Sequence, residues 1–151
     1  MNNLKFTFFT SILLTLNCLP LFKQIFMIKL VSRDNPDILA FKVKNEVDQE
    51  DVDWLVERIG QKYSKTQNSV SVYVEFENFE EITLSSSWKY LKMLLEYTFK
   101  LIKKVDKLAA ITSSKALRKK LSAEFFLIPN VQCKTFQESE CDQAVEWLEN
   151  I

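Results

Sequence analysis

The segment from Val70 to Lys104 constrains the fold more than any other part of the chain. It begins with a β-branched and aromatic run, Val70 to Phe76, that is typical of a buried strand. A short acidic stretch and three consecutive serines follow, and then an amphipathic segment that predicts a long helix over 86–104. In many α/β proteins the loop between a strand and the next helix carries the working site, so we look for function here.

The predicted helix has more apolar surface than one core contact needs. On an ideal helical wheel its apolar residues form two adjacent ridges that span roughly 200°, whereas one core-facing stripe needs about 100°. The ridges are Trp88, Leu91, Leu95, Phe99 and Ile102, and Tyr90, Leu94, Tyr97 and Leu101. One ridge can pack on the sheet. The other needs a partner, which can be another part of the chain, a second protomer, a hydrophobic ligand or a membrane.

A narrow basic stripe lies beside these ridges. From Lys89 to Lys120 the chain has ten basic and two acidic residues, a local excess of eight, although the whole chain carries no net charge. Such a belt suits anionic lipid headgroups or an acidic protein face, while the acidic regions around it disfavour nucleic acid. We therefore expect a contact surface made of Trp88, Leu91, Leu94, Leu95, Tyr97 and Phe99 with Lys89, Lys92, Lys100 and Lys103.

The residues that are missing argue against an enzyme. The chain has no histidine, which excludes Ser-His-Asp and Cys-His catalysis and the usual histidine metal sites. Gly60 is the only glycine, so a P-loop and a dinucleotide fingerprint are excluded. Glu75 and Glu77 share one face of the predicted strand, but no nucleophile accompanies them. We expect a non-catalytic protein with no catalytic residue, no cofactor and no metal.

Residues 1–26 form an apolar leader with two interpretations. Met27 begins a run that reads as a first strand, so the leader can be an over-extended start, and the protein is then cytoplasmic or peripheral to a membrane. If the leader is translated, its apolar run from Phe6 to Phe22 makes it an export signal or a membrane anchor.

Residues 27–151 predict one domain. Strands are expected over 28–32, 38–44, 70–76, 107–112 and 131–136, the first two as a hairpin. Between them we expect helices that begin after Asp48, after Ser113 or Ser114 and after Ser139, in addition to the helix over 86–104. Alternating strands and helices predict a single α/β domain, a mixed sheet of about five strands flanked by about four helices.

Five short pieces, in this order and spacing, resemble the SpoIIAA-like family over about Met27 to Ile151. They are Leu39-Ala40-Phe41, the segment VEFENF at 74–79, SWKYLK at 87–92, KLAAIT at 107–112 and DQAVEWL at 142–148. The family resembles STAS domains, which include the anti-sigma-factor antagonists, and also the CRAL-TRIO lipid-transfer fold.

This resemblance implies two classes of function. In the first, the domain binds a hydrophobic ligand or an anionic membrane surface through the helix over 86–104. In the second, it is an antagonist-like signalling module with a protein partner, switched by phosphorylation of a serine at the helix N-terminus, where Ser85, Ser86 and Ser87 lie. A plain helix cap is the other interpretation of these serines. A homodimer through the second apolar ridge remains a third way to cover the helix.

Overall fold

The computed structural model describes residues 27–44, 46–79 and 81–150, with the backbone alone for 81–86. The predicted leader over 1–26 lies outside these residues. One sheet has the strand order β1-β2-β3-β4-β5. β1 (Ile28–Val31) pairs antiparallel with β2 (Ile38–Lys44), and β3 (Val70–Glu77), β4 (Val105–Thr112) and β5 (Gln132–Phe136) continue in parallel. The expected single α/β domain with a mixed sheet is confirmed.

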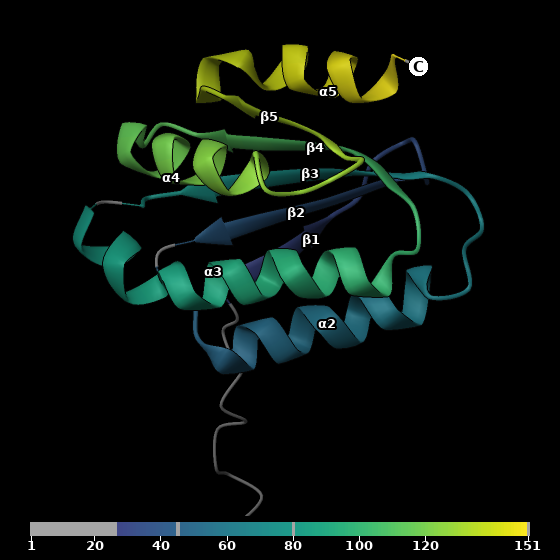
Figure 1. Cartoon of the computed structure of the whole chain (residues 1–151), viewed down its shortest axis with the longest axis horizontal. Helices are drawn as coiled ribbons and strands as arrows, with labels where there is room; N and C mark the ends of the chain where they lie inside the picture. The colour runs from purple at the N-terminus through teal and green to yellow at the C-terminus, as the bar shows by residue number, and fades with distance from the viewer. Residues whose placement is uncertain (1–26, 45, 80, 151) are drawn as a thin grey trace, which may run out of the picture.

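The helices divide unequally between the two faces of the sheet (Figure 1). Helices α2 (Gln49–Tyr63), α3 (Glu81–Leu101) and α4 (Lys115–Phe125) pack on one face, and only α5 (Cys141–Glu149) covers the other. Strand order follows chain order, and parallel crossovers are almost always right-handed, so each crossover helix arrives on the same face. A helix reaches the second face only after the edge strand β5.

Two apolar clusters correspond to these two faces. The larger contains Phe41, Val74 and Leu108 with the inner faces of α2, α3 and α4. The smaller contains Tyr73 and Phe136, with residues of β2, β4 and α5. Strands β2, β3 and β4 are therefore buried on both sides over much of their length, which explains their near-continuous apolar sequence.

Two of the three expected helix caps are present. The Asp48 side chain accepts a hydrogen bond from the backbone N–H of Asp51 at 3.0 Å, and the Asp51 side chain accepts one from Asp48 at 3.2 Å. Of the two candidate serines, Ser114 caps α4 and accepts from the Leu117 N–H at 3.2 Å. The prediction for Ser139 is wrong, because it lies in a 3₁₀ turn (Glu138–Glu140) and α5 begins at Cys141 without a side-chain cap.

Helix α3 begins earlier than the sequence indicated. It starts at Glu81 rather than near Ser86, since no proline or glycine interrupts the chain from Glu81 onward. The acidic residue at its first position suits the positive end of the helix dipole. Ser85, Ser86 and Ser87 consequently lie inside the helix, and the interpretation of these serines as a helix cap is wrong.

Ser87 has a structural role that was not expected. Its side chain is 1% exposed, and its hydroxyl oxygen accepts a hydrogen bond from the backbone N–H of Val47 at 3.0 Å. Val47 lies just before α2, so this bond connects α3 to the chain segment that leads from β2 into α2. It holds the two helices in register on the same face of the sheet.

Replacing this serine should destabilise the fold. In Ser87→Ala the buried N–H of Val47 loses its acceptor, and an unpaired buried donor costs about 1–3 kcal/mol. We expect the free energy of unfolding, measured by urea titration, to fall by that amount. Ser122→Ala is the control because Ser122 is exposed on α4. Equal stability of the two variants would show that the Val47 bond contributes nothing.

Candidate functional site

Half of the apolar residues in the predicted contact surface belong to the core. Leu91, Leu94 and Leu95 are buried, together with Ile102. These leucines contact the sheet and the neighbouring helices, so in this conformation they are not available to a membrane or an external ligand. Leucines from both ridges thus turn towards the core in this conformation, and their role as contact residues stays a prediction.

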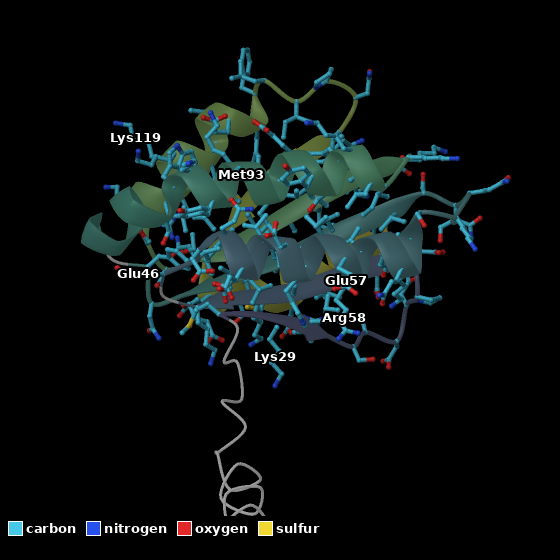
Figure 2. All side chains as sticks on the ribbon, turned by 90° about the horizontal axis from the view of Figure 1, so that it is seen from below. Lys29, Glu46, Glu57, Arg58, Met93 and Lys119 are labelled. Carbon is cyan, nitrogen blue, oxygen red and sulfur yellow. The ribbon has the colours of Figure 1, made fainter. Side chains whose placement is uncertain are left out.

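Apart from Tyr97, the remaining residues of the two apolar ridges find their partner within the same chain. Trp88, Tyr90, Met93, Phe99 and Leu101 are half-buried and pack against the larger core cluster. Helix α3 lies between α2 and α4 over the sheet, and both neighbours shield its flanks (Figures 1 and 2). Of the predicted aromatic contacts, Tyr97 is exposed, whereas Trp88 and Phe99 present only an edge to solvent.

The basic side chains of α3 lie on its outer side, as the helical wheel predicted. Lys89 and Lys100 are exposed and Lys92 is half-buried, while Lys103 is exposed just beyond Leu101, where α3 ends earlier than the predicted 104. They continue onto α4, where Lys115, Lys119 and Lys120 are exposed as well. We call the outer sides of α3 and α4 together the basic face.

Two contacts bind the helices of the basic face side by side. The Lys92 ammonium lies 3.4 Å from a carboxylate oxygen of Glu124, and the Lys120 ammonium lies 5.1 Å from the centre of the Trp88 ring. On α3, Lys92 follows Trp88 by four residues, and on α4 their partner Glu124 follows Lys120 by four. The two helices therefore run in the same direction with a constant register. The end of α4 therefore lies beside the second half of α3.

An exposed apolar tip completes the basic face. Phe126 is 91% exposed and Leu127 is 72% exposed, at the point where α4 ends. A shallow hollow of about 440 Å³ lies between this turn and the end of α3. It is lined by Phe99, Ile102, Lys103, Lys104, Val105, Asp106, Ile128, Pro129, Asn130 and Val131. Apolar side chains and lysines thus occur together at this end of the molecule.

Of the three serine candidates for phosphorylation, the structure describes the side chain of Ser87 alone. Ser85 and Ser86 lie in α3 among residues described by backbone alone, and Ser87 is buried and bonded to Val47. None of the three lies at the helix N-terminus, where the dipole would stabilise a phosphate most strongly.

A cluster of charges that the sequence analysis did not assemble lies on the other face of the sheet. The Lys42 ammonium lies 3.1 Å from Glu75 and 3.3 Å from Glu77, and the Lys44 ammonium lies 2.8 Å from Glu77. The Tyr73 hydroxyl donates to Glu75 at 3.2 Å. The sequence does contain a signal for this cluster, because charged residues lie two apart on both β2 and β3. They become neighbours once the two strands pair in parallel.

These carboxylates are occupied rather than free for catalysis. Lys44, with Lys42, lowers the pKa of Glu77 below its ordinary 4.5. The hydrogen bond to Glu75 likewise raises the pKa of Lys42. Burial, with Cys141 and Glu75 nearby, raises the pKa of Tyr73. Every shift favours the charge state already present at neutral pH, so the cluster stabilises the uncovered half of the sheet and offers no group poised to exchange a proton.

Within the part of the chain that the structure describes, no group of three or more histidine, cysteine, aspartate or glutamate side chains is placed to hold a metal ion. No described helix combines the length and the apolar character needed to cross a membrane.

The charge cluster predicts how stability depends on pH. The ion pair lowers the pKa of Glu77 in the folded protein relative to the unfolded chain. Glu77 therefore stabilises the fold above its unfolded-state pKa, and this stabilisation is lost as pH falls through its folded-state pKa. In Lys44→Met the pKa of Glu77 should rise towards 4.5, which a carbon-13 NMR titration of the carboxyl group measures. The stability difference between wild type and variant should then shrink on acidification.

Lys65→Met is the matched control, because Lys65 is exposed beyond the end of α2 and forms no ion pair among the described residues. It should leave the titration of Glu77 unchanged. An unaltered Glu77 pKa in Lys44→Met would contradict the assignment of the ion pair.

A family model describes most of this architecture. The SpoIIAA-like model matches residues 38–149, from the first residue of β2 to the last residue of α5. Comparison with curated proteins and comparison with solved structures found no match. The matched range contains the basic face, the apolar tip and the charge cluster, together with four of the five strands. The chain therefore belongs to the SpoIIAA-like family, and its domain is of the STAS type.

Proposed function

We propose that this chain is a non-catalytic binding domain that associates peripherally with an anionic membrane surface through its basic face. The observation that carries the proposal is the apolar tip: Phe126 and Leu127 are exposed to solvent at the end of a helix whose outer side is basic. Large apolar side chains exposed next to each other, with cations around them, are typical of an interface that inserts between lipid headgroups.

The apolar tip and the lysines of the basic face should contribute comparable binding energies. Burying one large apolar side chain contributes about 1.5–3 kcal/mol, and each lysine near an anionic leaflet contributes about 1 kcal/mol. Neither term alone gives stable binding, but the tip and several lysines together do. Lysine stems can also cover acyl chains while their ammonium groups remain at the phosphates.

The charges around the helices set the orientation of the domain. Figure 2 shows Lys119 and Met93 on the side of α3 and α4, whereas Glu46 and Glu57 lie towards α2. A negatively charged surface attracts the side formed by α3 and α4 and repels the acidic side at α2. The domain would therefore approach with α3 and α4 towards the lipid. An acidic protein surface would be attracted to the same side, and vesicle binding separates the two.

Binding should depend on both the lysines and the apolar tip. We expect the full chain to bind vesicles of mixed phosphatidylcholine and phosphatidylserine, and added salt to weaken binding. Lys115→Glu/Lys119→Glu and Phe126→Ser/Leu127→Ser should each weaken it by about tenfold or more, measured by vesicle sedimentation. All four residues are exposed, so the fold should survive the changes.

The control is Lys29→Glu/Lys65→Glu, which makes the same charge change at exposed positions outside the basic face. Residues 1–26 are present in every variant, so differences among variants report the domain. Equal binding by the control and by Lys115→Glu/Lys119→Glu would refute the orientation. If the tip variant bound as wild type, insertion of Phe126 and Leu127 would be refuted.

Association through the outer side needs no opening of α3. Leu91 and Leu94 remain in the core, so the amides of α3 should exchange hydrogen for deuterium equally slowly with and without vesicles. Mass spectrometry of α3 peptides measures this directly. Fast exchange in the free protein with protection by lipid would instead indicate a mobile helix whose buried ridge contacts the lipid.

A further inference from the structure

An exposed serine lies within the basic face, next to its apolar tip. Ser122 is on α4, four residues before Phe126 at the C-cap of this helix. On a helical wheel of about 100° per residue, four exposed side chains fall within about 60° of one another: Lys115, Lys119, Ser122 and Phe126. The serine hydroxyl therefore lies on the same stripe of α4 as the lysines and the tip that we propose to contact lipid.

The residues before Ser122 have a charge pattern that suits a protein kinase. Arg118, Lys119 and Lys120 are the only three consecutive basic residues of the chain, and they precede the serine by four, three and two positions. Lys119 and Lys120 are exposed. Kinases discriminate among substrates by charge, and a kinase with an acidic substrate groove favours a serine that follows basic residues.

Ser122 lies where α4 can open. A kinase takes the segment around its acceptor in an extended form, and α4 ends at Phe125, three residues after the serine. The N–H of Phe126 donates to the Ser122 carbonyl at 3.3 Å, and that of Leu127 donates to the Glu124 carbonyl at 3.0 Å. Helix ends open at a lower free energy than the core, so the last turn of α4 can present the serine while the sheet stays folded.

From these observations we propose that Ser122 is a phosphorylation site whose phosphate releases the domain from an anionic membrane. The release presupposes the membrane association proposed above. In the transfer, the Ser122 Oγ attacks the γ-phosphorus of ATP. The Oγ–P bond forms as the bond from this phosphorus to the ADP oxygen breaks, and the hydroxyl proton passes to a base of the kinase.

The phosphate would act through its charge. It carries about −1.5 to −2 charges at pH 7. Lys119 lies one helical turn before Ser122 and forms no ion pair among the described residues, so its ammonium can pair with the phosphate. A lysine paired in this way no longer attracts lipid headgroups. The remaining negative charge repels the anionic leaflet at the place where the tip would insert.

Phosphate transfer to the full chain tests the site itself. We expect the catalytic domain of protein kinase C, which selects serines next to basic residues, to phosphorylate Ser122 with ATP, and peptide mass spectrometry locates the phosphate. Lys119→Ala/Lys120→Ala should slow the transfer about tenfold or more, whereas Lys29→Ala/Lys65→Ala, at exposed positions outside the basic face, should not. No phosphate on Ser122 would overturn the assignment of the site.

Vesicle sedimentation tests the effect of the phosphate. The phosphorylated chain should bind mixed phosphatidylcholine and phosphatidylserine vesicles about tenfold more weakly or worse than the unmodified chain. Ser122→Glu should likewise bind more weakly than Ser122→Gln, which introduces a side chain of the same size without the charge. Ser139→Glu is the matched control, because Ser139 is exposed in the 3₁₀ turn before α5, outside the basic face.

The outcomes separate the site, the switch and the membrane association. Equal binding by the phosphorylated and the unmodified chain would overturn the switch, even if Ser122 accepts phosphate. An equal loss of binding in Ser122→Glu and Ser139→Glu would indicate an effect of net charge and refute the position. If the unmodified chain does not bind vesicles, the proposed function fails and the switch fails with it, whereas phosphate transfer needs no vesicle and reports on Ser122 alone.

Discussion

The structure depends on a parallel sheet whose strand order follows the order of the chain. Each right-handed crossover advances the sheet by one strand in the same direction, and this places α2, α3 and α4 on a single face. The other face receives one nine-residue helix, α5. Most of the apolar core is consequently concentrated on one side, and the remaining half of the second side needs a different means of stabilisation.

That need explains the charge cluster formed by Lys42, Lys44, Glu75 and Glu77. On strands without a covering helix, charged side chains two residues apart project into water and pair across the strands, while the intervening residues Phe41, Val43 and Val74 fill the core on the opposite side. Glu75 and Glu77, the paired carboxylates on β3, are thus part of a structural surface. Their lysine partners account for the lowered pKa of Glu77 without any catalytic role.

Crowding three helices onto one face also determines which surfaces remain for binding. Helix α3 lies in the middle, so most of its described apolar surface is consumed by the sheet, α2 and α4, and the described α3 side chains that are fully exposed are Lys89, Glu96, Tyr97 and Lys100. The apolar tip at Phe126 and Leu127 lies beyond the last turn of α4, where no other element covers it. The proposed membrane contact therefore lies on the side of the domain formed by α3 and α4.

Local features of the fold were readable from the residues because they depend on periodicity and nearby side chains. The hairpin and the strand over 38–44 follow from alternating apolar residues and the turn residues between the strands. The Asp48 cap follows from a carboxylate that accepts a hydrogen bond from the backbone N–H three residues later. The start of α3 did not follow, since the serine run resembled a cap although the preceding residues are equally able to form a helix. Ser87 shows the same limit: its partner Val47 is forty residues away.

By itself, the sequence determined the order of strands and helices, the α/β class and the resemblance that the family match later confirmed, because each depends on short-range patterns. It also determined that α3 has lysines on one side. Tertiary structure alone decided which residues of the two apolar ridges are buried and which carboxylates meet lysines. Those outcomes depend on contacts between residues remote in the chain, and periodicity carries no information about which distant surfaces meet.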